Sequence, residues 1–500
     1  MAKRAAQGLQ RIFWLVFSLA FGWVWFNAVL RWPHNGLAAV LAAAVLGALA
    51  FWLMHRLGPK ADRMQPRTFR WLLGGGLALH GALLIFAAFL LQEVLIMDWD
   101  VVWQSLPDFL NGLPLLEYNV YYIVCNNNLG IALLLAGLFK VLGLLGIRPG
   151  TPEGMAAAIL FNCFAIWLTS ALVCRAAWLI TRSRGAVLAA LAVCLLNPPP
   201  YLWAPCFYSD TLCMPFLMGA LVLFLQYRTA RSGLPRLALA AGMGLLTFAG
   251  FGIKGSIAVL LVALPVQFLL EQQGGIAGAL KAIAAMLITF GLLLGGYQYW
   301  QHHGVLDWND YEKYGLPIEL WFAYGSHGTG DYDQSYYELC AGQPTPAGRK
   351  AVMQQVIKEN YASRSPLGQL KFMTGKAALT WGDGKYNADE YLTTPVRANQ
   401  TALFTLPGQP LFMPVTYLCQ AVHYLLLGLT AAGGLWELAR RKQPGGPAPV
   451  QLALFGALLF LSLWETKARY ALHFAPCLAL CAVVCLWQIS AAVCRPVQAA

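Results

Sequence analysis

The residues of this sequence that could do chemistry are a few charged side chains placed between long apolar runs. Asp98 and Asp100 open the segment D-W-D-V-V-W-Q-S-L, and Asp210 stands in Y-S-D-T-L. Lys254 follows in G-F-G-I-K-G-S, and Arg469 in L-W-E-T-K-A-R-Y. A carboxylate in such a place can act as a general base on a hydroxyl group. A lysine and an arginine can hold a phosphate group and neutralise its developing charge.

Other polar and aromatic residues lie in the same segments or in similar ones, and we expect them to bind a substrate at the same site. They are Asn127, Asn128, Tyr208, Trp381, Asp383, Glu465 and Lys467. If the apolar runs pack as a bundle, these segments reach the same end of it. The side chains would then surround one cavity.

Each of these residues also has a structural interpretation. Asp98 could be a solvated residue beside a helix, and Lys254 could extend its ammonium group to the membrane surface. Arg469 and Lys467 could simply flank two helices. Asp383 lies in W-G-D-G-K-Y, where the Asp-Gly pair favours a tight turn. The three consecutive asparagines before the next apolar run could cap a helix. The sequence leaves these alternatives open.

The composition determines which elements must position these residues. Hydrophobic residues make up 59% of the 500 residues, and charged residues 11%, whereas a soluble domain has about 25% charged residues. This composition predicts an all-α polytopic membrane protein. The net charge of +12 is typical of a membrane protein, because lysine and arginine accumulate in the cytoplasmic loops of such proteins. We therefore expect membrane lipid, and no nucleic acid, as a partner.

Apolar runs of about 20 residues predict a bundle of about twelve or thirteen transmembrane helices with a large external loop domain. The expected order is N-terminal helices in residues 1–97, a first external loop with the catalytic acid in 98–128, a transmembrane core in 129–300, an external loop or cap domain in 301–412, and C-terminal helices in 413–500. In the fourth of these segments, residues 348–378 have helical spacing.

Basic loops orient the bundle, since lysine and arginine accumulate on the cytoplasmic side. The N-terminus and the loop from Arg56 to Arg70 are basic, so the third helix, 71–97, carries Asp98 outside. Three apolar runs then separate Asp98 from Asp210. Three full crossings would place the two acids on opposite faces, so one of these runs is expected to be re-entrant or incompletely crossing.

Several classes of function lack their sequence signals. The chain contains no G-x-x-x-x-G-K-[ST], so nothing indicates ATP bound at a P-loop. The twelve cysteines include no C-x-x-C pair and form no Cys/His pattern with zinc spacing. Paired broken helices in an internal repeat, which mark many transporters, are not apparent either.

Taken together, these motifs resemble the GT-C superfamily, the integral-membrane glycosyltransferases that use polyprenyl-phosphate sugars, including the protein O-mannosyltransferases. The segment D-W-D-V-V-W-Q-S-L is similar to the signature D-E-x-x-Y-x-x-x-A, with Asp98 on the aspartate and Leu106 on the small residue. Trp99 stands where that signature has a second acid, so Asp100 is the candidate replacement. Y-S-D-T-L and G-F-G-I-K-G-S resemble the second acidic motif and the G-x-x-x-L-x-K-G motif.

Further segments resemble a bacterial subgroup of these enzymes, among them Y-Y-I-V-C-N-N-N-L-G and F-M-T-G-K-A-A-L-T-W-G-D-G-K-Y. The resemblance implies that Asp98 is the base or orients the acceptor, and that Asp210 is a second site acid. It implies that Lys254 and Arg469 bind the donor phosphate in an inverting transfer. Some members use a divalent cation such as Mg or Mn and others do not, so a metal stays open.

The resemblance implies a multi-pass enzyme of the bacterial plasma membrane whose site faces outside. Its donor would be a polyprenyl-phosphate sugar, and its acceptor an envelope glycan, lipid or protein. Two other classes remain. A transporter of a lipid-linked sugar or envelope polymer would also need a polar cavity with cations, and would move its substrate without Asp98. A non-catalytic envelope scaffold would tolerate changes at all of these charges.

Overall fold

The computed structural model describes residues 2–32, 36–112, 115, 117–396, 405–440 and 446–494. In this part of the chain the secondary structure is helical, apart from one isolated β-bridge between Glu93 and Pro395. Ten of the described helices, some with an adjoining short turn, are long and apolar enough to cross a membrane, and three shorter apolar helices accompany them. The predicted all-α polytopic membrane fold is therefore confirmed.

The ten longer apolar helices are α1 (Ala2–Arg31), α2 (Gly36–Asp62), α3 (Pro66–Leu90), α6 (Leu129–Leu142), α7 (Pro152–Thr181), α11 (Met214–Tyr227), α12 (Leu234–Ile253), α14 (Gly275–Trp300), α22 (Phe412–Ala439) and α25 (Ala475–Cys494). The three shorter ones are α8 (Arg184–Leu196), α13 (Leu260–Glu271) and α23 (Ala448–Leu463).

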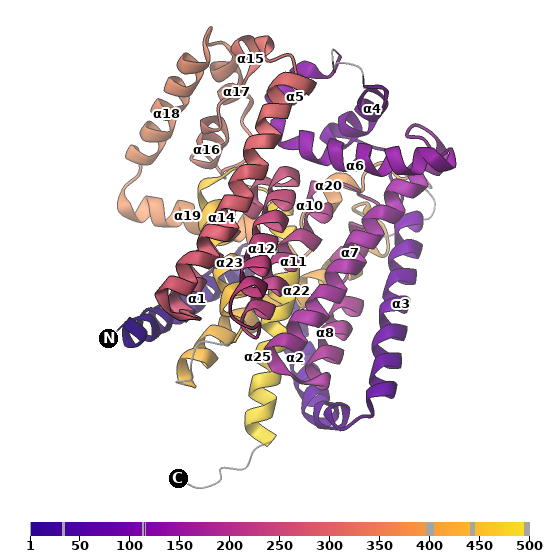
Figure 1. The fold of residues 1–500 in the computed structure, drawn as a ribbon, viewed down its shortest axis with the longest axis vertical. Coiled ribbons are helices and arrows are strands. Elements are labelled where there is room, and N and C mark those ends of the chain that lie inside the picture. Colours follow the sequence, from indigo (N-terminus) through magenta and orange to yellow (C-terminus); the bar gives the residue numbers. More distant parts are fainter. Residues whose placement is uncertain are drawn as a thin grey trace.

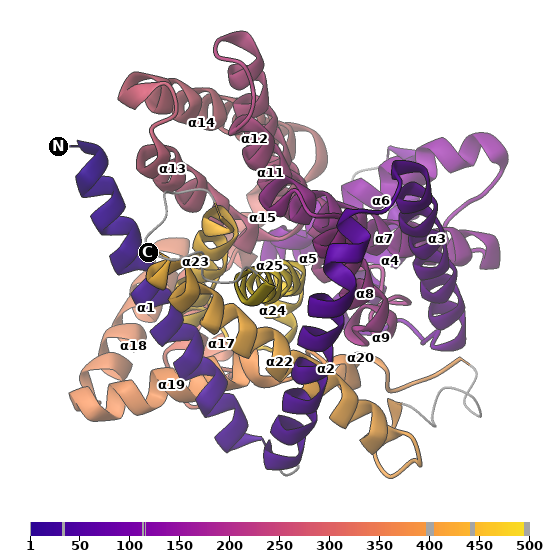
Figure 2. The same ribbon diagram turned by 90° about the horizontal axis from the view of Figure 1, so that it is seen from below.

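The bundle is built around α25, which lies near its middle in the view from below (Figure 2). α25 packs against α22, α7, α8 and α2. Every residue from Cys477 to Leu486 is buried, as expected for a helix that is apolar on all sides. The outer helices expose large apolar side chains instead, for example Leu41 and Leu292. Such surfaces are suited to lipid.

The basic loops gather at the lower end of the bundle (Figure 1). Asp62 at the end of α2 accepts a hydrogen bond of 2.9 Å from Ser183 Oγ, which joins the loop after α2 to the loop between α7 and α8. Arg228 pairs with Glu271 at 2.6 Å and donates to the Gly446 carbonyl at 2.9 Å. The loops after α11, α13 and α22 therefore meet.

The direction of α6 explains why the number of membrane crossings between Asp98 and Asp210 was ambiguous from the sequence. α6 runs crosswise to α3 and α7 over the upper end of the bundle (Figure 1). α7 then runs down and α8 runs up, so the chain returns to the upper end before Asp210. Of the three apolar runs in question, the first is the one that does not cross along the bundle. Length and composition alone could not distinguish it from a crossing helix.

The predicted third helix and first loop are corrected by the structure. α3 ends at Leu90 rather than near Met97, and residues 97–111 form α4 (Met97–Asn111), followed by α5 (Asn119–Val124). Trp99, Val102, Trp103 and Leu106 are buried at helical spacing, which gives α4 one apolar face. The signature segment is therefore an amphipathic helix with Asp98 in its first turn.

The segment after α14 forms a helical region at the upper left of Figure 1. Its helices are α15 (Asn309–Tyr314), α16 (Glu319–Gly325), α17 (Gln334–Ala341), α18 (Pro346–Ala362) and α19 (Pro366–Gly382). The chain then returns to the bundle, where it forms α20 (Ala388–Tyr391). The helical pattern of 348–378 is two helices rather than one, because Ser365 caps α19 and Pro366 occupies its first turn. Leu320, Tyr324, Cys340 and Met353 form a small separate core.

Candidate active site

Asp98 lies in a chain of hydrogen bonds at the upper end of the bundle. Tyr121 Oη of α5 donates to Asp98 Oδ1 at 2.9 Å, and Asn128 Nδ2 donates to Tyr121 Oη at 2.7 Å. Tyr208 Oη in turn donates to Asn128 Oδ1 at 2.9 Å. Burial raises the pKa of Tyr208 well above its ordinary value, and the nearby Asp98 raises it further. The tyrosine therefore keeps its proton and acts as a donor.

Asp210 forms the second part of the site. It lies in α10 (Ser209–Leu212), and its carboxylate is completely buried. Lys254 Nζ is 2.6 Å from Asp210 Oδ1, whereas Arg469 Nη1 is 3.8 Å from Asp210 Oδ2. The first contact is a charge-assisted hydrogen bond, and the second is an ion pair beyond hydrogen-bond distance. One carboxylate thus faces two cations, which leaves the group with one net positive charge.

Aromatic rings surround the Arg469 guanidinium, which lies in α24 (Arg469–Leu472). Its Cζ is 5.2 Å from the ring centroids of both Tyr391 and Tyr470, and 5.8 Å from that of Tyr208. Lys254 Nζ lies 4.8 Å from the Tyr470 ring. Cations over tyrosine faces are attracted by the ring quadrupole. The rings hold both cations in place. The side chains of Lys254 and Arg469 are each still 14% exposed.

Tyr208 joins the two parts. Its hydroxyl reaches Asn128 and lies 3.5 Å from Asp98 Oδ2, while its ring lies beneath Arg469. Together with Asp210 and Lys254, these residues come from five separate segments of the chain. Their contacts make one network with the Asp98 carboxylate at one end and the two cations at the other.

A close approach of two glycines brings α6 onto α12 and so sets the distance between Asn128 and Lys254. A Cβ atom on Gly130 would lie 1.7 Å from the carbonyl oxygen of Gly252. Only glycine fits at position 130. α12 ends at Ile253, and Lys254 has an extended backbone (φ −145°, ψ 108°), which turns its side chain out of the helix towards Asp210.

A buried pair behind the cations connects their two segments. Ser256 Oγ lies 2.8 Å from His473 Nε2, and these residues follow Lys254 and Arg469 by two and four positions. Burial, with a smaller contribution from Lys254, lowers the pKa of His473 to about 3. The ring is therefore neutral at physiological pH, so it links the two segments without adding charge.

Three other predicted residues lie around this network. Asn127 Nδ2 donates to Asn128 Oδ1 at 3.0 Å, and Glu465 accepts from Tyr470 Oη at 3.1 Å. Burial raises the pKa of Glu465. Lys467 Nζ pairs with Asp331 at 3.3 Å and with Glu390 at 3.6 Å. This lysine belongs to the more exposed rim, where α20 and the loop after α16 meet the segment before α24.

The structure does not bring the remaining three predicted residues into the network. Asp100 accepts from Gln104 Nε2 at 3.2 Å, within its own helix. Trp381 is buried and packs edge-on against Phe21 at 5.7 Å. Asp383 accepts from two backbone N–H groups of its own turn. Two residues on a helix separated by two positions point to different faces, which explains why Asp98 and Asp100 diverge.

The residues present do not fit a divalent cation. Asp98 accepts from a tyrosine and Asp210 is paired with two cations. Within the described residues, no three His, Cys, Asp or Glu side chains are grouped so that they could hold a metal ion.

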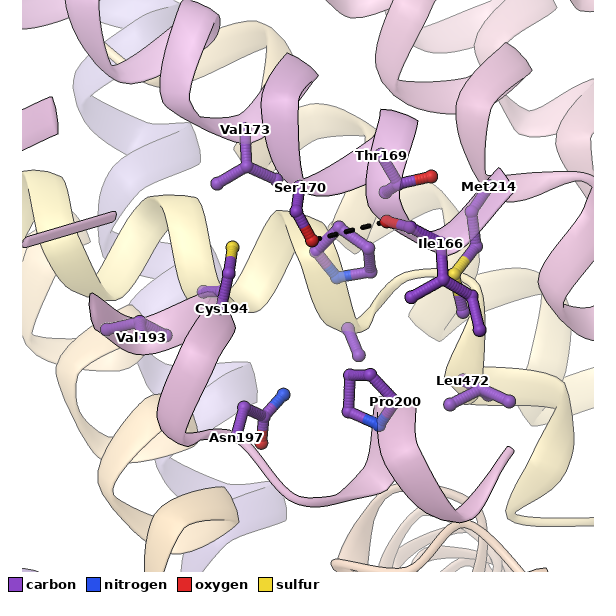
Figure 3. A pocket seen from close by; sticks show the side chains of 13 residues that line it. Ile166, Thr169, Ser170, Val173, Val193, Cys194, Asn197, Pro200, Met214 and Leu472 are labelled. Atoms are coloured by element: carbon purple, nitrogen blue, oxygen red, sulfur yellow. Dashed lines mark hydrogen bonds between the residues drawn. The ribbon is translucent and has the colours of Figure 1, made fainter. Parts of the chain in front are cut away.

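A mainly apolar cavity lies between α7, α8, α11 and α25 (Figure 3). Met214 and Leu472 line it, and they follow Asp210 and Arg469 by four and three positions. Ser170 on its wall donates to the Ile166 carbonyl, as Figure 3 shows, and contacts His80 Nε2 at 3.0 Å. None of the predicted site residues lines it.

The sequence did not identify Tyr121, Tyr391 and Asn387, although all three contact the network. Tyr121 lies in the segment Y-Y-I-V-C-N-N-N, but α5 ends at Val124 and Asn128 lies in a separate short turn, so no helical spacing marked this tyrosine. Tyr391 and Asn387 follow W-G-D-G-K-Y, and only the fold brings them to Arg469.

One comparison with known proteins identifies the family. The family model described as "conserved hypothetical integral membrane protein" matches residues 1–490. The chain belongs to this family. A comparison with curated proteins found no match. Membership agrees with the many apolar helices and establishes an integral, multi-pass membrane protein.

Proposed function

We propose that this protein is a membrane glycosyltransferase which moves a sugar from a polyprenyl-phosphate-linked donor to an acceptor at the outer face of the bacterial plasma membrane. The observation that carries the proposal is the network through Tyr208. A carboxylate held by hydroxyl donors and a pair of cations held by tyrosine rings lie in direct connection at one end of an apolar bundle.

The two ends of the network suit the two halves of a single displacement. Asp98 would take the proton of the acceptor hydroxyl as its oxygen bonds to the anomeric carbon. The bond from that carbon to the phosphate oxygen would break, and the lipid phosphate would leave with the electron pair. Lys254 and Arg469 would neutralise the phosphate charge. Attack from the face opposite to the phosphate inverts the anomeric carbon.

The location favours a lipid donor. The lower end of the bundle carries the basic loops, which by the positive-inside rule lie in the cytoplasm. The network lies at the opposite end, where soluble nucleotide sugars are not supplied. A polyprenyl-phosphate sugar carries its phosphate at the membrane surface. We expect the end of the bundle that carries Lys254 and Arg469 to lie at the same level.

The test is sugar transfer by the purified protein in proteoliposomes, with a panel of radiolabelled polyprenyl-phosphate sugars and an envelope extract as acceptor. Label should pass from the organic phase to the acceptor with at least one donor, and protein-free liposomes should show no transfer. Movement of labelled lipid between the leaflets without transfer would contradict the proposal and favour a transporter. Neither transfer nor movement, with folded protein, would favour a scaffold.

A further inference from the structure

The turn W-G-D-G-K-Y-N, which precedes α20, is not used by the proposed chemistry, yet hydrogen bonds hold its backbone from several sides. Asp383 Oδ1 accepts from the Lys385 N–H at 2.9 Å, and Asp383 Oδ2 accepts from the Asn387 N–H at 2.6 Å. These contacts confirm that Asp383 acts as a turn residue. They also place Asn387 in the left-handed conformation, with φ 58°. Asparagine tolerates this conformation better than most residues.

Asn387 uses its side chain to hold the backbone of the arginine segment. Its Oδ1 accepts from the Ala468 N–H at 2.6 Å and from the Arg469 N–H at 3.3 Å. The first N–H groups of a helix have no partner within that helix. An amide oxygen from a distant part of the chain therefore accepts from the N–H groups at the start of α24. This contact fixes the backbone position of Arg469.

The back of the turn is anchored to the bundle. Gln420 of α22 accepts from the Gly384 N–H at 3.0 Å and donates to the Gly382 carbonyl at 2.7 Å. A Cβ atom on Gly384 would lie 2.6 Å from the Cys419 carbonyl, so the turn lies directly on α22. Trp203 Nε1 donates to the Lys385 carbonyl at 3.1 Å. The turn is thus a rigid support rather than a loose connection.

The same turn continues to Tyr391, whose ring lies 5.2 Å from the Arg469 guanidinium and 5.1 Å from the Trp203 ring. It therefore supports Arg469 twice, at the backbone through Asn387 and at the charged group through Tyr391.

We infer that Asn387 is a positioning residue for the donor phosphate, because its amide oxygen sets the backbone from which Arg469 reaches the phosphate. This inference rests on the proposed function for its phosphate, and on the contacts alone for its effect on Arg469. Glycine is the informative substitution at this position, since Asn387→Gly keeps the left-handed backbone free of strain and removes only the amide side chain.

The first measurement is amide hydrogen exchange of the protein in nanodiscs. Asn387→Gly should accelerate exchange in residues 466–472 and leave α22 and α25 unchanged. The matched control is Asp389→Asn, which alters the neighbouring pair with Lys385 and contacts neither Ala468 nor Arg469. Unchanged protection of 466–472 in Asn387→Gly would overturn the inference.

The second measurement is the affinity for undecaprenyl phosphate, a polyprenyl phosphate without sugar. Asn387→Gly should raise its dissociation constant about threefold to tenfold, the effect of losing one hydrogen bond that orders a binding group. In an Arg469→Ala background the same substitution should have no further effect, since residues that act through one another are not additive. Equal effects in both backgrounds would contradict action through Arg469.

The two readouts separate this inference from the proposed function. If Arg469→Ala leaves the affinity for undecaprenyl phosphate unchanged, the phosphate role of the site fails. The exchange result in residues 466–472 still decides whether Asn387 positions the arginine.

Discussion

Removal of the Lys254 ammonium tests the energetics of the cation site, because Asp210 is completely buried. In Lys254→Met the carboxylate would keep only Arg469, at 3.8 Å instead of the 2.6 Å of Lys254. Taking away one partner of a buried ion pair costs about 3–5 kcal/mol, since a buried charge is left without compensation. Arg469 compensates part of the loss, so we expect a decrease in unfolding free energy of about 3 kcal/mol.

The comparison with Lys467 makes this number decisive. Lys467 is also a lysine paired with carboxylates, but Asp331 and Glu390 are 46% and 41% exposed. Exposed ion pairs contribute about 0–1 kcal/mol. Lys467→Met should therefore cost less than about 1 kcal/mol in the same assay, which is denaturant titration in a single detergent followed by tryptophan fluorescence.

A double-mutant cycle then isolates the pair. Asp210→Asn removes the buried charge, so adding Lys254→Met to it should cost little further stability and give a coupling of about 2 kcal/mol. Additive losses, or equal losses in Lys254→Met and Lys467→Met, would refute the assignment of Lys254 as the main partner of a buried Asp210.

Three further predictions concern other parts of the molecule. Tyr208→Phe removes the hydroxyl that donates to Asn128 and keeps the ring beneath Arg469. In steady-state kinetics with a lipid-linked donor, kcat should therefore fall about tenfold while the affinity for the donor is retained. A loss of donor affinity would contradict this division of roles. Burial raises the pKa of Glu93 from 4.5 to about 7, so the stability of the folded state is complete below pH about 4.5 and is lost as the pH rises through 7. Glu93→Gln should therefore stabilise the protein by about 3 kcal/mol at pH 8.5 and by less than about 1 kcal/mol at pH 5. An equal gain in melting temperature at the two pH values would contradict this. Arg349 is buried and donates to the carbonyls of Gly315, Glu312 and Lys313. Arg349→Met should therefore lower the unfolding free energy of residues 301–411 by about 3 kcal/mol and speed limited proteolysis of this region. An unchanged cleavage pattern would count against a separate core in this region.

Sequence reasoning worked best where composition and order carry the information. Apolar runs and basic loops predicted the membrane bundle, and four charged residues between these runs, Asp98, Asp210, Lys254 and Arg469, meet at one end of it. When crossings alternate, segments separated by an even number of crossings face the same end, and this relates Asp210, Lys254 and Arg469 without any knowledge of the packing.

It failed where one apolar pattern allows two directions. α6 has the length and composition of a crossing helix, but the close contact of Gly130 with Gly252 lays it across the bundle. Hydropathy does not report such contacts. The signature segment was expected as a loop because its acids stand out, although the buried face of Trp99, Val102 and Trp103 makes it a helix.

The supporting residues were the least predictable. Tyr121 has no property in the sequence that distinguishes it from Tyr122, yet Tyr121 Oη bonds to Asp98 while Tyr122 Oη bonds to Ser105. Asn387 reaches Ala468 across 81 positions of sequence. These roles depend on three-dimensional proximity, which periodicity and composition do not contain.

The central claim, that Asp98 serves as the base of a lipid-dependent sugar transfer, is tested most directly by comparing Asp98→Asn with Asp100→Asn in proteoliposomes. Both substitutions remove one carboxylate from the first turn of α4, but only Asp98 belongs to the hydrogen-bonded network. We expect transfer from a radiolabelled polyprenyl-phosphate sugar to fall at least a hundredfold in Asp98→Asn, with donor binding intact, and to stay near the wild-type rate in Asp100→Asn. Full transfer by Asp98→Asn, or loss of transfer in Asp100→Asn alone, would show that Asp98 is not the base.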